Sequence, residues 1–170
     1  DAQQDGITLK GFQGDQTFAG GSGDDDLFGQ EGDDTLQGRG GDDILRGGFG
    51  DDILEGGAGD DILSGGTDED TLVGGKGDDT LIGGKGDDTL TGGRGSDTFV
   101  QNFSEQGADT ITDFNPGMDT IELQGFGGIE NISRISLTEV DGGTRIEVAN
   151  GSTPGSDTSG STLFVEGVTP

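Results

Sequence analysis

The sequence contains no cysteine, histidine, tryptophan or tyrosine. Without cysteine and histidine, the chain has no thiol chemistry, no zinc site of the usual kind and no histidine-based acid–base mechanism. Small secreted domains are normally stabilised by disulfides or by bound metal. Because disulfides are excluded, metal is the remaining means of stabilisation.

Apolar residues are also scarce. They make up 26 % of the 170 residues, whereas globular domains have about 45–50 %. Glycine alone contributes 39 residues. The chain is therefore expected to be disordered unless something other than apolar burial holds it together. No stretch is long enough for a membrane span, and no signal peptide is visible. The chain begins at Asp1 rather than at methionine, as expected of a fragment or a processed product.

The charge is strongly one-sided. Acidic residues number 35 and basic residues 8, which gives a net charge of −27. Such self-repulsion opposes compaction and argues against nucleic acid or an anionic membrane surface as a partner. It favours cations. Carboxylates are hard oxygen ligands, suited to Ca²⁺ or Mg²⁺ rather than to Zn²⁺ or Cu²⁺.

A nine-residue repeat begins at Gly20 and runs through nine consecutive units to Val100. Position 1 is always glycine, and position 4 is glycine except at Asp68. A weaker unit, GFQGDQTFA, precedes the repeat from Gly11 to Ala19. Position 6 is always aspartate: Asp25, Asp34, Asp43, Asp52, Asp61, Asp70, Asp79, Asp88 and Asp97. Position 8 is leucine or, at the end, phenylalanine: Leu27, Leu36, Leu45, Leu54, Leu63, Leu72, Leu81, Leu90 and Phe99.

The residue types predict the shape of one unit. Threonine and isoleucine dominate position 7, which favours a short strand over positions 7 to 9. Side chains alternate across a strand, so the uniformly apolar position 8 should face inward. One inward residue in every nonapeptide makes a thin core. It fits two short sheets that face each other, with two repeat units in each coil.

Positions 1 to 6 are expected to form a glycine-rich turn whose carbonyl groups are unobstructed. We infer that carbonyls 1 and 3 face one neighbouring turn and carbonyls 2 and 4 the other. With the position 6 aspartate of each turn, this makes a site of about six oxygens, as Ca²⁺ prefers. Turns two units apart stack, so full sites pair Asp25 with Asp43 and so on to Asp79 with Asp97. This predicts about seven ions, and a defective eighth site would join Gln16 to Asp34.

The carbonyl groups predicted as ligands all belong to positions 1 to 4. They are those of Gly20, Gly21, Ser22, Gly23, Gly29, Glu31, Gly32, Gly38, Gly40, Gly41, Gly47, Gly48, Phe49, Gly50, Gly56, Gly57, Ala58, Gly59, Gly65, Gly66, Thr67, Asp68, Gly74, Gly75, Lys76, Gly77, Gly83, Gly84, Lys85, Gly86, Gly92, Gly93, Arg94 and Gly95.

Three units depart from the pattern. Gln30 and Arg39 replace glycine at position 2, and Asp68 replaces it at position 4. Aspartate tolerates a left-handed backbone better than most residues, so the turn of Asp68 should survive. Position 5 is also mostly acidic. These carboxylates are interpreted as solvated outer charges, with tuning or loose capture of ions as the alternative.

The repeat G-G-x-G-x-D-x-U-x resembles the calcium-binding nonapeptide of the RTX family over residues 11–100. The resemblance implies an all-β fold, a parallel β-roll that is a right-handed β-solenoid with two nonapeptides per turn. It also implies a secreted, extracellular bacterial protein that passes a type I secretion apparatus unfolded and folds when it meets Ca²⁺. Residues 1–19 would lead into the roll of residues 20–100, and residues 101–170 would cap it.

Beyond Val100 the period is lost, and alternating stretches predict antiparallel strands at 109–114, 119–123, 132–140, 144–149 and 162–168. Asp141-Gly142-Gly143 favours a hairpin turn, and residues 150–161 a flexible loop. The segments GADTITDF and GMDTIEL resemble the sequence that follows the repeats in serralysin-type proteases. Asp109, Asp113 and Asp119 would either bind one further ion or be solvent-facing carboxylates in turns.

Three classes of function come into question. The first is a calcium-responsive folding module without membrane insertion, monomeric or weakly self-associating. The second is an enzyme, but catalysis needs carboxylates in different environments, whereas these repeat in equivalent ones. We therefore expect no catalytic site in this chain, although its parent protein could be an enzyme. The third is a surface or adhesin segment that binds polysaccharide through outward positions 7 and 9, which are mixed in character.

Overall fold

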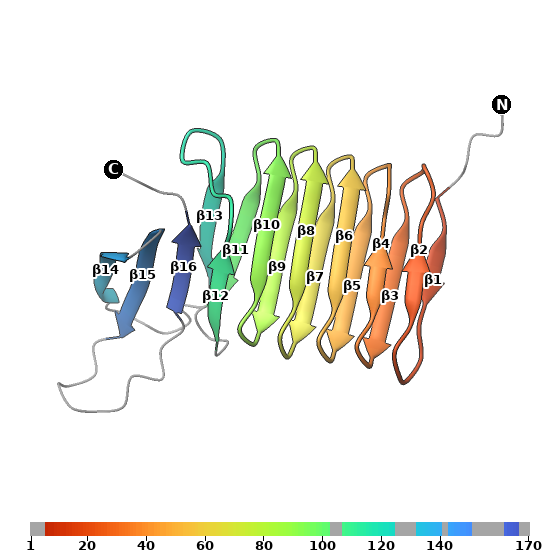
Figure 1. Ribbon diagram of the computed structural model, residues 1–170, viewed down its shortest axis with the longest axis horizontal. Helices are drawn as coiled ribbons and strands as arrows, with labels where there is room; N and C mark the ends of the chain where they lie inside the picture. The colour runs from red at the N-terminus through yellow and green to blue at the C-terminus, as the bar shows by residue number, and fades with distance from the viewer. Residues whose placement is uncertain (1–5, 103–106, 125–131, 141–142, 151–161, 167–170) are drawn as a thin grey trace.

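The computed structural model describes residues 6–102, 107–124, 132–140, 143–150 and 162–166. These residues form two sheets and no helix, and the strands alternate between the sheets along most of the chain (Figure 1). The described part of the chain has no helix that could cross a membrane. One sheet contains, in spatial order, β1 (Thr8–Lys10), β3 (Asp26–Glu31), β5 (Ile44–Phe49), β7 (Ile62–Thr67), β9 (Thr80–Lys85), β11 (Thr98–Asn102) and β13 (Thr120–Gln124). The other contains β2 (Thr17–Ala19), β4 (Thr35–Gln37), β6 (Ile53–Ala58), β8 (Thr71–Lys76), β10 (Thr89–Arg94), β12 (Ala108–Ile111), β16 (Thr162–Glu166), β15 (Gly143–Asn150) and β14 (Ile132–Val140).

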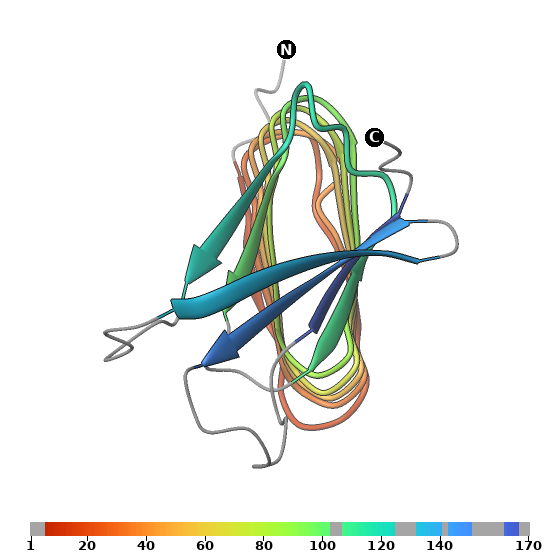
Figure 2. The same ribbon diagram turned by 90° about the vertical axis from the view of Figure 1, so that its left-hand side faces the viewer.

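The repeat sets the register of both sheets. Leu45 pairs with Leu63 in one sheet and Leu54 with Leu72 in the other, so parallel partners lie two repeat units apart, one full coil. Seen along its axis, the roll is a set of nested coils, each with two straight sides and two turns (Figure 2). The predicted all-β solenoid with two nonapeptides per coil is therefore confirmed.

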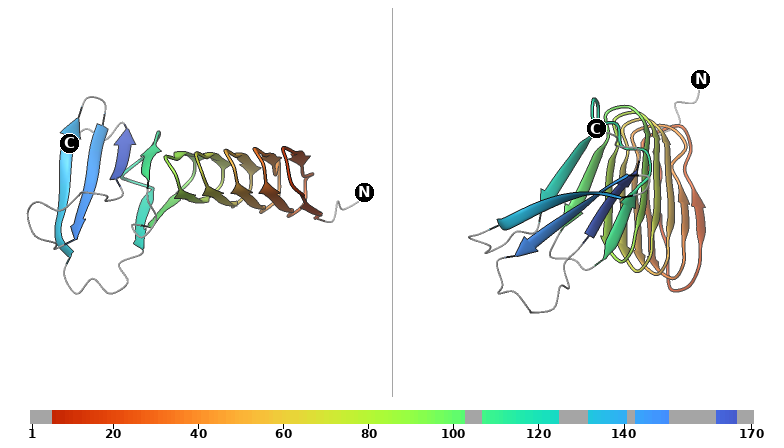
Figure 3. Two further views of the ribbon diagram at one scale, coloured as in Figure 1. Left: turned by 90° about the horizontal axis from the view of Figure 1, so that it is seen from below. Right: turned by 60° about the vertical axis from the view of Figure 1, so that its left-hand side comes forward.

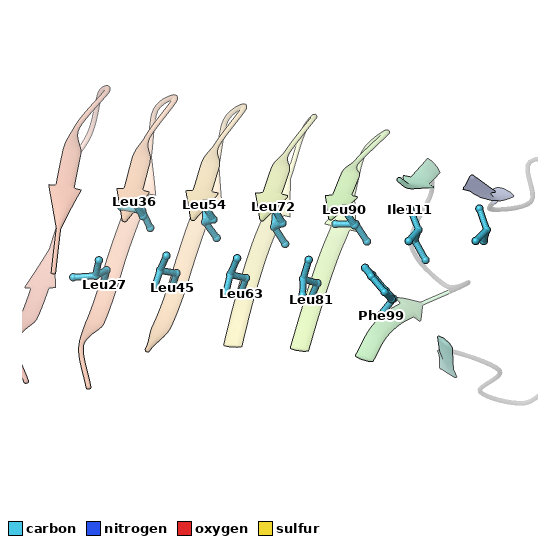
Figure 4. Packing of buried hydrophobic residues seen from close by; sticks show 11 residues of the cluster. Leu27, Leu36, Leu45, Leu54, Leu63, Leu72, Leu81, Leu90, Phe99 and Ile111 are labelled. Atoms are coloured by element: carbon cyan, nitrogen blue, oxygen red, sulfur yellow. The ribbon is translucent and has the colours of Figure 1, made fainter. Parts of the chain in front are cut away.

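The core is a double row of side chains between the sheets. Every position 8 residue from Leu27 to Phe99 is at most 1 % exposed, and Ile111 and Val165 extend the row toward the C-terminal end. The leucines of the two sheets face one another across the interior (Figure 4). The predicted inward direction of position 8 is confirmed.

The strands are longer than the predicted span of positions 7 to 9. From β5 to β10 each strand continues from position 7 into position 3 of the next unit. The cause is the stacking of identical coils, because backbone groups at positions 1 to 3 find partners in the neighbouring coil, as where Gly48 pairs with Gly66. Stacking thereby extends the ladder into residues that propensity alone assigns to a turn.

The C-terminal segment contains both parallel and antiparallel strands. β12 and β13 pair in parallel with β10 and β11, so they continue the roll beyond the predicted limit at residue 100. The prediction that they are antiparallel is wrong, because each has an open edge of a parallel sheet beside it. β14 pairs antiparallel with β15, and β15 with β16, as predicted. β16 also pairs in parallel with β12, contrary to the prediction, and so joins this group to the roll (Figure 3). Val140 pairs with Gly143, so the predicted hairpin is present, but Gly143, which was predicted to lie in the turn, is the first residue of β15. Residues 141–142, 151–161 and 167–168, which include most of the predicted loop, lie outside the described residues.

Candidate metal centre

The position 6 aspartates form two buried rows, one along each side of the roll. All nine, from Asp25 to Asp97, are at most 3 % exposed. Each lies at the end of a turn, directly before the strand that carries the inward leucine. Aspartate is almost never buried to this extent without a partner, so the two oxygens of each carboxylate have to be accounted for.

The Oδ1 atom of each aspartate accepts a hydrogen bond from the preceding coil. The backbone N–H of Asp43 donates to Asp61 Oδ1 at 2.8 Å, and that of Asp61 donates to Asp79 Oδ1 at 2.9 Å. The same bond recurs along both sides of the roll, each time between residues two repeat units apart. Each carboxylate therefore joins its own turn to the turn one coil earlier.

The Oδ2 atom has a different environment. In seven of these residues it is buried and has no hydrogen-bond partner. Leaving a buried acceptor unpaired is costly, and more so when it carries charge. A cation beside each Oδ2 atom would offset that cost. The seven residues are Asp34, Asp43, Asp52, Asp61, Asp70, Asp79 and Asp88.

Glycine at position 1 provides the space in front of Oδ2. A Cβ atom built on Gly38 would collide with Asp43 Oδ2 and would lie 2.7 Å from the carbonyl oxygen of Gly56 in the next coil. The same arrangement recurs at Gly56, whose Cβ would lie 2.8 Å from Asp61 Cγ. A carboxylate oxygen and a carbonyl oxygen of the next coil thus approach one small volume that only glycine leaves free.

The turn carbonyls alternate in direction. Those of positions 1 and 3 point to the preceding coil: Gly56 O accepts from Arg39 N at 2.7 Å, and Ala58 O accepts from Gly41 N at 2.9 Å. Those of positions 2 and 4 point to the following coil, as where Arg39 O accepts from Ala58 N at 3.0 Å. This is the alternation that the sequence predicts. A carbonyl has two lone pairs, so an oxygen that accepts one hydrogen bond keeps a second pair for another partner.

Burial disfavours the charged form of these carboxylates and raises their pKa. Desolvation is the largest cause that raises the pKa of Asp52 to about 6, of Asp61 to about 7 and of Asp70 to about 8. The hydrogen bond from the preceding coil lowers the pKa of each, and neighbouring aspartates raise it. A divalent cation would reverse the balance by favouring the charged form.

The donor set fits calcium. It consists of single carboxylates and backbone carbonyls, which are the hard oxygen ligands that Ca²⁺ takes in flexible loops. Within the described residues, no three acidic or other metal-binding side chains are gathered into one cluster. Each site would therefore draw most of its oxygens from the backbone, which explains why the turn residues are mostly glycine.

The position 5 carboxylates are exposed, as predicted, but they are also bonded. Asp24 Oδ1 accepts from Asp42 N at 2.9 Å, and Asp42 Oδ1 accepts from Asp60 N at 2.9 Å. These bonds reach toward the following coil, whereas those of position 6 reach toward the preceding one. The sequence analysis interpreted the position 5 carboxylates as solvated charges and did not predict this second row of hydrogen bonds. The recurrence of aspartate at position 5 was the sequence signal for it.

The units that depart from the repeat keep the backbone of the others. Gln30, Arg39 and Asp68 have φ values of 91°, 80° and 83°. They are the only non-glycine residues with positive φ in the described part of the chain, and each replaces a repeat glycine. The expectation that Asp68 tolerates this conformation is confirmed.

Asp109, Asp113 and Asp119 do not gather around one ion. Asp109 Oδ1 accepts from Asp88 N at 3.2 Å and Asp119 Oδ1 from Asp97 N at 3.1 Å, so these two extend the position 6 rows. Asp113 instead binds two backbone N–H groups of the last full unit, at 2.9 and 2.8 Å. The G-x-D-T-I pattern shared by residues 107–111 and 117–121 was the sequence signal for this continuation.

Comparison with known proteins gives three results. The family pattern described as the RTX calcium-binding nonapeptide repeat matches in 4 copies, at residues 10–45, 28–63, 37–72 and 64–99. The solved structure of the extracellular lipase LipA from Serratia marcescens is similar at 20 % identity and a TM-score of 0.35 over 99 % of this chain. This chain spans only 39 % of that lipase. The AlgE6R3 subunit of the Azotobacter vinelandii mannuronan C5-epimerase is similar at 25 % identity and a TM-score of 0.35, over 91 % of this chain and 71 % of that one. A search of curated proteins gave no match.

Proposed function

The chain belongs to the family of RTX calcium-binding nonapeptide repeats, and from this we propose that it is a module of a secreted protein that folds when calcium binds between its stacked turns. We call the space between two turns one coil apart a gap and name it by its two aspartates. The proposed ligands in a gap are these aspartates, carbonyls 2 and 4 of the first turn and carbonyls 1 and 3 of the second.

The observation that carries the proposal is the row of buried, unpaired Oδ2 atoms. Each approaches a carbonyl oxygen of the next coil in a volume that a Cβ atom would fill. Calcium supplies the positive charge that makes such a row of oxygens stable. Because the same aspartate contributes Oδ1 to one gap and Oδ2 to the next, ions in consecutive gaps would share carboxylates.

The charge and the energy both favour folding coupled to ion binding. Residues 20–100 contain 21 acidic and 5 basic residues, a net charge of −16, which about seven divalent ions would nearly cancel. At a calcium concentration ten times the dissociation constant, each ion adds about 1.4 kcal/mol. About seven ions would then add about 10 kcal/mol, the whole stability of an ordinary domain.

The proposed cellular role follows from this dependence. In a cytosol with little free calcium, repulsion and glycine entropy keep the repeats extended, in a form suited to a type I secretion channel. Outside the cell, where calcium modules bind in the range of roughly 10⁻⁴ to 10⁻³ M, the roll assembles. In this proposal the chain itself is not catalytic, since its repeated carboxylates share one environment.

Circular dichroism of the purified chain tests the proposal. We expect a weak β signal in EGTA, a strong cooperative gain with Ca²⁺ and little gain with the same concentration of Mg²⁺, because Mg²⁺ demands a tighter octahedral shell. Equilibrium dialysis should show several ions bound per chain. A chain that keeps its full β signal and a cooperative melt in EGTA would contradict the proposal.

A further inference from the structure

The gaps are not all alike, and the first gap on each side of the roll differs from those that follow. Two stacks of turns run along the roll, and among the described gaps that contain two full turns their first gaps are Gln16–Asp34 and Asp25–Asp43. The second turns of these gaps contain Gln30 and Arg39, the two residues that replace glycine at position 2. The later units from Gly48 to Gly93 all keep that glycine.

A side chain at position 2 covers one of the proposed ligands. A Cβ atom built on Gly57 would lie 2.7 Å from the carbonyl carbon of Arg39, one coil earlier, and closer still to its oxygen. Gly48 stands in the same relation to the carbonyl of Gln30. Arg39 occupies the same position in the second turn of the Asp25–Asp43 gap, and the position 2 carbonyl of the first turn is that of Gly21. That carbonyl is one of the oxygens that an ion in this gap would need.

The rest of each side chain supplies hydrogen-bond donors. Arg39 Nη1 donates to the carbonyl oxygen of Gly20 at 3.1 Å, and Gln30 Nε2 donates to that of Gly11. Both acceptors are position 1 carbonyls of the first turn, which are not among the proposed ligands of the gap. In later coils the position 1 carbonyl accepts from a backbone N–H of the preceding coil, as Gly56 O does, whereas here it accepts from a side chain of the following coil. The guanidinium also brings a positive charge, which repels a second cation close to it.

The side-chain oxygens of the first residues of these gaps, Asp25 and Gln16, also have hydrogen-bond donors. Asp25 Oδ2 accepts from Gly21 N at 2.6 Å, and Gln16 Oε1 accepts from Phe12 N at 3.0 Å. Gln16 is moreover uncharged. In the next six gaps, which begin with Asp34 to Asp79, the corresponding Oδ2 atom is unpaired. Among these eight gaps, the two that contain a position 2 side chain are therefore the ones whose first carboxylate or amide oxygen already has a hydrogen-bond donor.

On the side of the Asp25–Asp43 gap the backbone shows the same boundary. β2 and β4, which precede the turns of this gap, are three residues long and end at position 9. On the other side β3 already continues to position 3, as do the strands from β5 to β10. In addition, Gly21 and Gly23 are absent from the positive-φ glycines, whereas Gly57 and Gly59 have φ values of 119° and 133°. The turn of Asp25 thus lacks the conformation of the later turns.

We propose that Arg39 and Gln30 keep calcium out of the Asp25–Asp43 and Gln16–Asp34 gaps by placing their own side-chain donors there. The inference rests on the proposed function, because it concerns which gaps bind the ion. The ion row then begins at Asp34 on one side and at Asp43 on the other. Asp25–Asp43 drops out of the predicted seven sites, and the predicted eighth does not form.

The test counts bound ions by native mass spectrometry in a calcium titration of the full chain. Arg39→Gly restores the residue of the later units at a backbone angle that suits it, and we expect it to bind one ion more than the wild type. Arg39→Lys keeps both the Cβ atom and the charge, so it should bind the wild-type number. Arg94→Gly removes an arginine from an exposed position 3 and is the matched control for charge; it should also bind the wild-type number.

The other gap is tested in the same way. Gln16→Asp combined with Gln30→Gly should gain one ion, whereas Gln16→Asp alone should gain none, because Gln30 still covers its carbonyl. An unchanged count in Arg39→Gly, or an equal gain in Arg94→Gly, would overturn the inference. A wild-type chain that binds no calcium would instead overturn the proposed function, so the two failures are distinguishable.

Discussion

From β5 to β11 each strand pairs in parallel with a near copy of itself two repeat units along the chain, whereas β14, β15 and β16 share no period and pair antiparallel. The coils bury a double row of leucines and a double row of aspartates. β14 and β15 are longer, at 9 and 8 residues, and none of the three C-terminal strands carries the repeat. The coils therefore have two stabilising elements: a thin apolar core, and rows of carboxylate oxygens that can bind cations.

The comparison also explains why the C-terminal strands are needed. A parallel solenoid exposes the edges of its last strands, and such edges invite association with other chains. β12 forms part of that edge, and β16 pairs with it through four residue pairs beginning at Ala108 and Thr162. β15 and β14 then add outward in the same sheet. The repeat thus ends in strands whose sequences lack the glycine-rich turns of the repeat.

Removal of calcium should produce the largest difference in stability between the coils and the C-terminal strands. In EGTA we expect hydrogen exchange to become fast throughout β5 to β10, since the stabilisation by ion binding is lost. Protection in the β14–β15 hairpin should fall much less. Exchange measured by mass spectrometry with and without calcium gives the comparison directly. Equal losses in both regions would show that the C-terminal strands have no stability of their own.

The second largest effect should come from truncating a leucine of the buried row. Leu63→Ala removes a fully buried side chain and should lower the free energy of unfolding of the calcium-loaded chain by about 2–5 kcal/mol. Its neighbour Ile62 points outward and is 45 % exposed, so Ile62→Ala should cost well under half as much. Urea denaturation in saturating calcium measures both. Similar costs would mean that the leucine row is not the core.

Substitution of one position 6 aspartate should affect two neighbouring gaps, because both use its carboxylate. Asp61 contributes Oδ1 to one gap and Oδ2 to the next, so Asp61→Asn should weaken two ions, worth about 3 kcal/mol at calcium ten times the dissociation constant. Asp60→Asn changes the adjacent position 5 carboxylate and should leave the ion count unchanged. Calorimetric titration distinguishes them. The loss of one ion, or of none, in Asp61→Asn would argue against shared carboxylates.

Acid should replace part of the effect of calcium. In the metal-free folded chain, burial raises the pKa of Asp52 to about 6 and of Asp70 to about 8, whereas unfolded aspartate titrates near 3.9. The folded form therefore binds more protons, so its stability rises as pH falls through about 8 to 6 and is fully present below about pH 4. Circular dichroism in EGTA should show more β structure at pH 5 than at pH 8. The reverse order would contradict the raised pKa values.

The smallest effect concerns backbone strain. Asp68 holds a φ of 83° at a position that is glycine in the other units. Asp68→Gly should raise the free energy of unfolding by about 1 kcal/mol or less, partly offset by loss of the bonds from Gly50 N and Thr67 Oγ1 to its carboxylate. Asp60→Gly, where φ is not positive, should be destabilising. Thermal melts in saturating calcium compare the two.

Much of the roll could be predicted because every unit repeats the same residue types at the same positions. The inward leucine, the choice of the position 6 aspartate as a candidate ligand and the alternation of turn carbonyls follow from the residue types at nine fixed positions. Strand ends and the parallel pairing of β12 and β13 could not be predicted in this way. Both depend on whether a neighbouring coil offers a free edge, and that neighbour lies at least two repeat units away in the sequence.

The sequence by itself determined the coil length, the residues that face inward and the chemistry of the turns, since each is a local property that the repeat restates nine times. Only the tertiary structure decided which carboxylate oxygens are left without a partner and which are already bonded. Arg39 meets Gly20, and Asp113 meets Gly92, only when successive coils are stacked. The physical reason is that hydrogen bonds and charges act through space, so the role of a side chain at an irregular position is set by the neighbour that stacking brings to it.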